Sequence, residues 1–212
     1  MALTKVRGGG VDNPLTLGGG AASDRSIIFD GNAQDFHIGL DDSTDKLTIG
    51  KGTALGTTTS ITFDANGQIL KPLQTYFRVR KSGHQENFAT GTNVVVTWET
   101  EDFDVGGNFA SNTFTAPVTG IYLFHLTLRL DNLETASGYY SASINTSNRE
   151  YRWIEHFPTI SDKSYFTVHV TAIIDMDASD TADARIYQHS STAQTDIKDD
   201  QTRTLFQGYL LG

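Results

Sequence analysis

The sequence predicts an all-β protein, in which a C-terminal sandwich or jelly roll follows a glycine-rich arm and a short β-shaft. Residues 122–130 alternate apolar and polar side chains, with Tyr, Phe and three Leu on one face, and residues 166–176 repeat this period of two. Threonine occurs 28 times and no segment has a convincing period of 3.6 residues, so strands are favoured over helices. About eight to ten strands in ~140 residues indicate a sandwich or jelly roll.

Composition divides the chain into an apolar-poor N-terminal third and an aromatic-rich remainder. Residues 1–70 hold 12 of the 20 glycines but only three of the 20 Phe and Tyr residues. The N-terminal third cannot bury much surface alone, and copies of the same chain are the simplest partner. We therefore expect an extended arm over 1–23, a trimeric β-shaft over 24–73 and a knob over 74–212.

The arm contains two glycine triplets, Gly8–Gly10 and Gly18–Gly20, with Pro14 between them. Glycine is costly to order, and few apolar residues anchor this stretch. Two interpretations stay open: a flexible tail, or a segment that becomes ordered when it docks on a larger particle.

The shaft region has short β-branched runs separated by turn signals, which is typical of hairpins. The pattern I-x-F-D-x-N-x-Q occurs at 27–34 and again at 61–68. This echo suggests a repeated β-turn unit. Lys71-Pro72 then predicts a hinge into the C-terminal domain.

Charge and composition exclude several classes. The net charge is −9, which disfavours nucleic-acid binding. Cysteine is absent, which excludes disulfides and thiolate metal sites. No run approaches the ~18–20 apolar residues of a membrane span, so we expect no membrane insertion. Lys5 and Arg7 are not followed by an apolar stretch, so we expect no secretory signal.

Two anchors carry a family resemblance. Residues 103–124 contain F-D-V-G-G-N-F followed by F-T-A-P-V-T-G-I-Y-L-F, and residues 206–211 read F-Q-G-Y-L-L. Both resemble the signature of the C1q-like domain, over roughly 74–212. The resemblance implies a ten-stranded jelly roll that assembles as a compact homotrimer and acts as a recognition module, not an enzyme. Residues 1–6 and the glycine-rich arm resemble the start of bacteriophage tail-fibre proteins.

Metal sites have two weak candidates, and no cofactor is expected. Asp175, Asp177, Asp180 and Asp183 crowd oxygen ligands that would suit Ca²⁺, but the spacing is not that of an EF-hand, and the alternative interpretation is a solvated turn between two strands. His37 is either a solvent-facing strand residue or one of three imidazoles on the axis of a three-fold shaft.

The loops far from the shaft are the predicted contact surface. Both termini of a C1q-like domain lie at its base, and successive antiparallel strands alternate ends. Loops 81–93, 131–138, 156–164 and 190–203 are then distal, and the acidic loop 176–183 lies at the base. The predicted receptor contacts are His84, Asn87, Asp131, Asn132, His156, Asp162, Lys163, Asp196 and Lys198.

The sequence therefore predicts a non-enzymatic homotrimeric phage fibre or spike on the virion surface. Residues 1–23 would bind other virion proteins, and the knob would bind a host-cell surface glycan or protein. Two alternatives stay open. One is a structural virion component, such as a capsid fibre or adaptor that binds another viral protein. The other is a cellular, extracellular C1q-like recognition protein.

Overall fold

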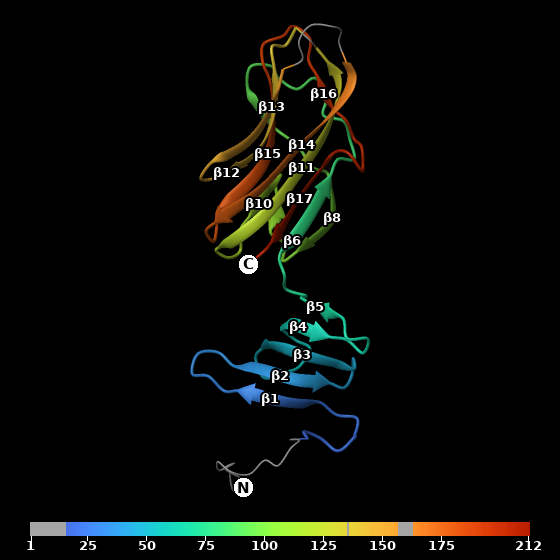
Figure 1. Cartoon of the computed structure of the whole chain (residues 1–212), viewed down its shortest axis with the longest axis vertical. Coiled ribbons are helices and arrows are strands. Elements are labelled where there is room, and N and C mark those ends of the chain that lie inside the picture. Colours follow the sequence, from blue (N-terminus) through green and yellow to red (C-terminus); the bar gives the residue numbers. More distant parts are fainter. Residues whose placement is uncertain (1–15, 135, 157–162) are drawn as a thin grey trace. The chain divides into compact units, whose positions relative to one another are not determined.

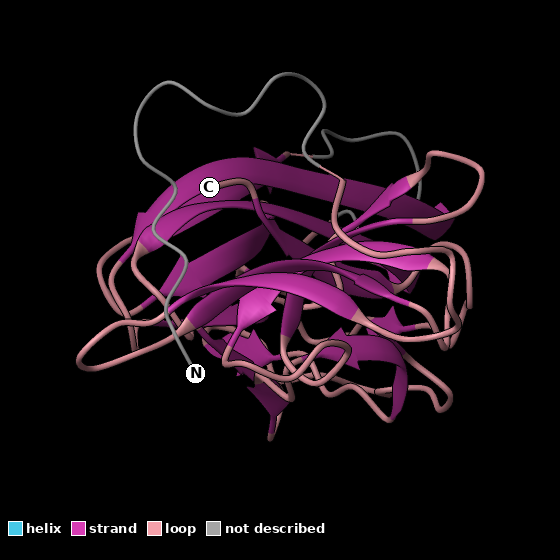
Figure 2. Cartoon of the chain, turned by 90° about the horizontal axis from the view of Figure 1, so that it is seen from below, coloured by secondary structure: helices cyan, strands magenta, loops and turns pink. Residues whose placement is uncertain are grey.

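The computed structural model describes residues 16–134, 136–156 and 163–212. This part of the chain contains strands and loops but no helix, as Figure 2 shows, so the predicted all-β class is confirmed. It accordingly contains no helix long and apolar enough to cross a membrane. The chain divides into two compact units, one ending at Leu73 and one running from Gln74 to Gly212.

The N-terminal unit is a five-stranded antiparallel sheet in which each strand pairs with the next (Figure 1). Its strands are β1 (Arg25–Phe29), β2 (Phe36–Asp41), β3 (Lys46–Lys51), β4 (Thr59–Phe63) and β5 (Ile69–Leu70). Each copy of the repeated I-x-F-D-x-N-x-Q pattern begins in a strand, the first in β1 and the second in β4. Each copy then continues into the hairpin that follows its strand. Asp64 caps the second hairpin by accepting hydrogen bonds from the backbone N–H of Asn66 and Gln68.

One face of this sheet buries polar side chains. His37, Asp41, Thr48 and Thr62 are all buried, because the loop after β3 folds over them. Lys51 N–H bonds to Thr58 O at 2.9 Å, and a Cβ on Gly39 would lie 2.9 Å from a methyl of Leu55 in that loop. His37 is 0% exposed, so the two positions expected for it, facing solvent or an axis, are wrong. Its own chain already covers the imidazole.

The opposite face exposes apolar side chains. In β2 the burial alternates, so Phe36, Ile38 and Leu40 point away from the covered face. Strand register places Ile27 opposite Ile38, Phe29 opposite Phe36 and Leu47 opposite Leu40. We call this the apolar sheet face; its most exposed members, at 36–59%, are Ile27, Phe29, Phe36, Ile38, Leu40, Leu47 and Ile69.

The C-terminal unit is a sandwich of two antiparallel sheets. The first has the order β14 (Lys163–Met176), β11 (Gly120–Leu133), β17 (Leu205–Leu210), β6 (Tyr76–Arg80) and β8 (Thr100–Val105), with β16 (Asp196–Ile197) on β11. The second has the order β13 (Glu150–Glu155), β12 (Tyr140–Thr146), β15 (Thr181–Gln188), β10 (Thr113–Thr115) and β9 (Phe109–Ala110), with β7 (Asn93–Val95) on β15. From β10 onward the chain crosses repeatedly between sheets, which is a jelly roll.

An aromatic cluster fills the space between the two sheets. Phe77 lies 4.9 Å from both Phe109 and Phe114 in the opposite sheet, measured between ring centroids. Phe206 stacks on Phe124 at 5.8 Å. Most aromatics of the signature therefore form the core, as such spacing along strands predicts.

The outer face of the first sheet carries a second exposed apolar group. Tyr76 packs edge-on against Phe103 and stacks on Tyr209. Strand pairing places Tyr209 opposite Leu123, and Leu123 opposite Ile173, which is 65% exposed. We call this the second apolar face; its members are Tyr76, Phe103, Ile121, Leu123, Ile173 and Tyr209.

Candidate functional site

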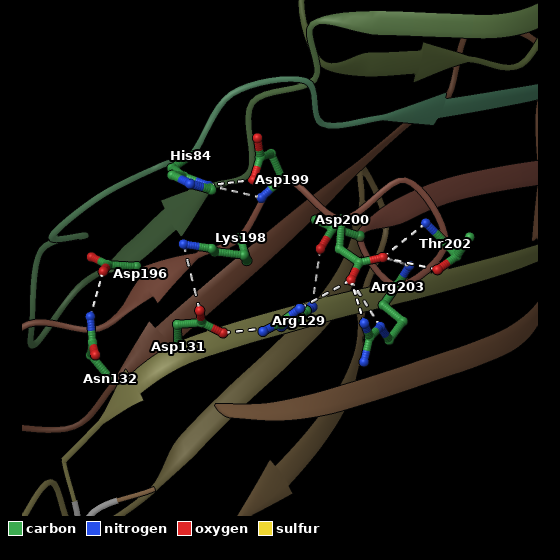
Figure 3. A network of polar contacts seen from close by, with 11 residues as sticks. His84, Arg129, Asp131, Asn132, Asp196, Lys198, Asp199, Asp200, Thr202 and Arg203 are labelled. Atoms are coloured by element: carbon green, nitrogen blue, oxygen red, sulfur yellow. Dashed lines mark hydrogen bonds and ion pairs between the residues drawn. The ribbon is translucent and has the colours of Figure 1, made fainter. Parts of the chain in front are cut away.

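Three chain segments meet at one end of the sandwich, drawn in Figure 3. Strand β11 starts beside the C-terminus, where Ile121 N–H bonds to Gly212 O at 2.8 Å, and ends at Leu133. The end of the sandwich near Leu133, which we call the loop end, is therefore opposite the end that carries Gln74 and Gly212. Fully buried Ile197 anchors the meeting point, because it pairs with Leu130 on β11 and bridges to Gln85.

Asp196 clamps two asparagines that have left-handed backbones. Its carboxylate accepts a hydrogen bond from Asn87 N–H at 2.7 Å and another from Asn132 Nδ2 at 2.8 Å. The φ angles of Asn87 and Asn132 are 52° and 59°. Asparagine tolerates this region better than most residues. The clamp thus fixes the loop after β6 against the end of β11.

Basic and acidic side chains alternate along the next row. Asp131 accepts a hydrogen bond from Arg129 Nε at 3.1 Å and faces Lys198 Nζ at 3.7 Å. The Arg129 guanidinium lies 5.4 Å from the centre of the Tyr165 ring, in cation–π geometry. His84 Nδ1 lies 2.6 Å from an Asp199 carboxylate oxygen, which makes an ion pair when the imidazole is protonated.

Asp200 is the most strongly held acid of this network. It accepts hydrogen bonds from Thr202, from Arg129 at 3.2 Å and from Arg203 at 2.9 Å. Burial raises the pKa of Asp200, but the bonds from Thr202 and Arg129 and the charge of Arg203 outweigh it and lower the pKa to about 2. The same contact with Asp200 raises the pKa of Arg129. Both groups are therefore charged at neutral pH.

Replacing Asp200 by asparagine is expected to lower the free energy of unfolding by about 2 kcal/mol at neutral pH, because charged hydrogen bonds are lost. The pKa of this carboxyl is lower in the folded chain than its ordinary 3.8, so its stabilisation is present above pH 3.8 and lost as pH falls through about 2. Urea unfolding of Asp200→Asn and wild type at about pH 7 and about pH 2.5 measures this. An equal gap at both pH values contradicts it, and Asp30→Asn in an exposed turn is the matched control.

A cleft of about 320 Å³ adjoins the network. Polar side chains line much of it, from Asn132 and Glu134 at the end of β11, Lys163 and Ser164 at the start of β14, and Gln194 before β16. Its volume falls within the range of about 300–1,000 Å³ seen for small-molecule sites.

The predicted contact residues have different positions. Six join the polar network: His84, Asn87, Asp131, Asn132, Asp196 and Lys198. Lys163 lines the adjoining cleft. His156 is exposed just beyond β13 and has no contact with this network within the ranges given above. Asp162 lies outside the described residues.

The acidic residues predicted as metal ligands make contacts with other residues. Asp180 accepts hydrogen bonds from Ser147 and Asn148, which lower its pKa together with the backbone N–H of Asp177. Asp183 pairs with Arg185 at 2.6 Å, and Asp175 lies in β14 opposite Ile121. In the described part of the chain, no group of three or more His, Cys, Asp or Glu is placed to hold a metal ion.

Sequence reasoning missed the residues that hold the loops together. Arg129 and Tyr165 belong to long strands, and Asp200, Thr202 and Arg203 form one tight turn. The order D-x-T-R in that turn is a signal that could have been used, since Asp side chains often bond to backbone N–H groups two residues on. The role of Arg129 depends on pairing 71 residues away and has no local signal.

Comparison with known proteins bears on the fold alone. No protein-family model matches the sequence, and no curated protein matches it. Among solved structures, the globular domain of zebrafish complement 1qA protein is similar, at 16% identity and a TM-score of 0.46, over 65% of this chain and 98% of that chain. Murine APRIL at pH 8.0 is similar at 12% identity and a TM-score of 0.49, over 65% and 99%.

Proposed function

We propose that this chain is a non-enzymatic homotrimeric fibre protein of a phage virion, which binds a host-cell surface glycan or protein through the loop end of its sandwich. The observation that carries the proposal is how the surface is divided. Apolar side chains gather on one sheet face of each unit, and charged and amide groups gather at the loop end. Exposed apolar faces of this extent are typical of surfaces where protein chains assemble. Polar loops held on a rigid scaffold are typical of surfaces that recognise a ligand.

The N-terminal segment supports the virion context through its resemblance to tail-fibre proteins. In this proposal residues 1–23 dock on the particle. The shaft and knob then hold three copies of the loop end at fixed spacing. Linked sites exceed single-site affinity by ~10²–10⁴ when geometry permits, so each loop end needs only weak affinity.

Three nitrogen-bearing side chains at the loop end provide the test. Changing His84, Lys163 and Lys198 together to alanine is expected to reduce attachment of the purified full chain to host cells by at least ~100-fold, because all three copies lose contacts. Flow cytometry with labelled protein on a panel of bacterial strains measures this. Lys71→Ala with Arg149→Ala removes exposed cations elsewhere and should leave attachment unchanged.

Two results would overturn the proposal. One is equal attachment by the triple variant and wild type, with matching circular dichroism spectra. The other is the absence of attachment by wild type across the panel together with capture of another virion protein by the loop end. That second result would assign the chain a structural role inside the particle.

A further inference from the structure

Two histidines lie close together on the outer face of the first sheet, and none of the functions above uses them. His125 on β11 and His169 on β14 have ring centroids 5.9 Å apart and ring planes 24° apart. Their side chains point away from the core, which the next residue in β11, fully buried Leu126, faces instead. Leu123 lies two residues before His125, and Ile173 lies four residues after His169. The histidine pair therefore borders the second apolar face.

Threonine hydroxyls connect the two imidazoles in one hydrogen-bonded row. His125 Nδ1 lies 2.7 Å from Thr171 Oγ1, and His125 Nε2 lies 2.9 Å from Thr127 Oγ1. The same Thr127 oxygen lies 2.9 Å from His169 Nδ1. A hydroxyl has one hydrogen to donate, whereas a protonated imidazole donates from both nitrogens. The protons that this row can hold can therefore be counted.

The row satisfies two neutral rings or one positive charge, but not two charges. With neutral rings, His169 donates to Thr127, Thr127 donates to His125, and His125 donates to Thr171. If His125 alone is protonated, it donates to both threonines and Thr127 donates to His169. If both rings are protonated, both donate to Thr127 Oγ1, and the Thr127 hydrogen loses its acceptor in the row. Two positive rings then lie 5.9 Å apart.

Burial favours the neutral form of the inner ring. Burial and then the positive charge of His169 lower the pKa of His125. Thr127, which lies between the rings, is only 4% exposed, so little water reaches the oxygen that they share. A chain that covered this face would remove more water and oppose protonation further.

No carboxylate is placed to balance a charge on these rings. Neither imidazole makes an ion pair with an acid of the described chain, and β17 places uncharged Gln207 opposite His125. Asp131 pairs with Arg129 and Lys198. The charged groups on this face of the surrounding strands are Arg129 and Asp131 on β11, Asp175 on β14, and Arg78 and Arg80 on β6, and the tyrosines are Tyr165, Tyr209 and Tyr76.

The two acids nearest in the sheet order are committed or distant. Asp102 on β8 pairs with Arg80 at 2.7 Å and with Arg78 at 3.5 Å. Asp175 lies opposite Ile121, at the far end of β14 from the loop end. Protonation of the histidine pair would therefore leave a net positive charge at the centre of this face.

We propose that neighbouring copies of this chain cover the second apolar face together with the histidine pair at neutral pH, and separate when both histidines are protonated. This inference rests on the proposed trimer and adds its regulation. Each chain carries a net charge of −9, so copies repel one another, and contact is least opposed at a face whose centre holds no acid. Every copy brings the same pair, so protonation adds like charge to every copy inside the contact.

Acid acts on the assembly through proton uptake by the separate chains. The separate chains bind protons that the assembled chains exclude, so association is strongest above the pKa of the separate chains and weakens as pH falls below it. A histidine with the ordinary pKa of ~6.5 weakens association by up to ~30-fold at about pH 5 if the assembly excludes its proton. Each copy has two such rings, so the effect is large enough to separate the chains.

Light scattering of the full chain at about pH 7.5 and about pH 5 tests this inference, with EDTA present so that no metal ion bridges the imidazoles. The expected mass is three chains at the higher pH and one chain at the lower pH, with unchanged circular dichroism and recovery on neutralisation. His125→Gln with His169→Gln keeps polar groups beside the threonines but cannot titrate, so this double variant should keep three chains at both pH values. His156→Gln, at an exposed ring outside the row, should behave as wild type.

A single variant replaces the double variant if that fails to assemble at neutral pH. His169→Gln changes an exposed ring and leaves the bonds of His125 to Thr171 and Thr127 in place. Its row cannot hold two charges, so its mass at about pH 5 should exceed that of wild type at the same protein concentration. A mass equal to that of wild type would contradict the role of the pair.

Three results would overturn the inference and leave the proposed trimer in place. The first is a wild-type mass of three chains at both pH values. The second is separation of the double glutamine variant at about pH 5 to the same extent as wild type. The third is loss of the β-sheet circular dichroism signal at that pH, which would mean unfolding instead of separation. Single wild-type chains at neutral pH would overturn the trimer and this inference together.

Discussion

If the chain forms the proposed trimer, replacing Ile38 and Ile173 together by aspartate is expected to leave only single chains in solution. Ile38 lies at the centre of the apolar sheet face, paired with Ile27 and Ile49, and Ile173 is 65% exposed on the second apolar face. Seven large side chains on the first face alone expose roughly 500 Å² of apolar surface. The largest apolar patch on a typical monomer is ~300–600 Å² and is often a contact surface, so we expect a partner to cover this face.

The expected size of this effect follows from burying carboxylates. A buried charge without a partner costs several kcal/mol, and a trimer would contain three at each face. Each single variant should therefore weaken assembly, and the double variant should abolish it. Light scattering of both singles and the double measures this. Ile154→Asp, at a side chain 57% exposed on the other sheet, should leave the mass unchanged. A double variant with wild-type mass would show that neither face is an interface.

Replacing Phe206 by alanine is expected to lower the free energy of unfolding of the C-terminal unit by about 3–5 kcal/mol. Phe206 is fully buried, and its ring centroid lies 5.2 Å from that of Phe77 and 5.8 Å from that of Phe124. Neighbouring Gly208 leaves no room for relaxation, since a Cβ there would already lie 2.5 Å from Phe77. The cavity therefore stays open, and the loss is a large fraction of the ~5–15 kcal/mol typical of a domain.

Urea unfolding followed by tryptophan fluorescence measures this loss, because Trp98 stacks on Phe206 and reports on the same core. Ile154→Ala removes exposed apolar atoms and should change the unfolding free energy by less than ~0.5 kcal/mol. A loss below ~1 kcal/mol for Phe206→Ala would mean that this ring does not pack between the sheets.

The sandwich could be predicted because its strands are half-buried. In β11 and β14, one face packs on the core and the other does not, so the sequence alternates over long stretches. The five N-terminal strands could be located from their turns, since Asp, Asn and Gly separate most of them and two glycines mark the loop between β3 and β4. Both signals are local, and local signals survive without knowledge of tertiary contacts.

The orientation of the N-terminal sheet could not be predicted. In β2, His37, Gly39 and Asp41 alternate with Phe36, Ile38 and Leu40, and period two alone does not say which set is covered. That choice depends on the loop after β3, whose Leu55 approaches Gly39. Burial of polar residues under a loop reverses the usual pattern, which is why the expectations for His37 failed.

The loop-end site was only partly predictable for a similar reason. Successive antiparallel strands run in opposite directions, and this is enough to bring the predicted loops to one end of the sandwich. The pairing of Asp131 with Lys198 and of His84 with Asp199 depends on the register of two-residue β16 on β11. So short a strand has no detectable pattern.

The solution mass of the purified full chain, measured by light scattering, tests the central claim most directly. The account predicts a mass of three chains, close to three times 23.2 kDa, because both apolar faces need covering. A mass of one chain at micromolar concentration would contradict it, since the exposed faces would then be stable in water and the multivalent attachment proposed above would have no basis.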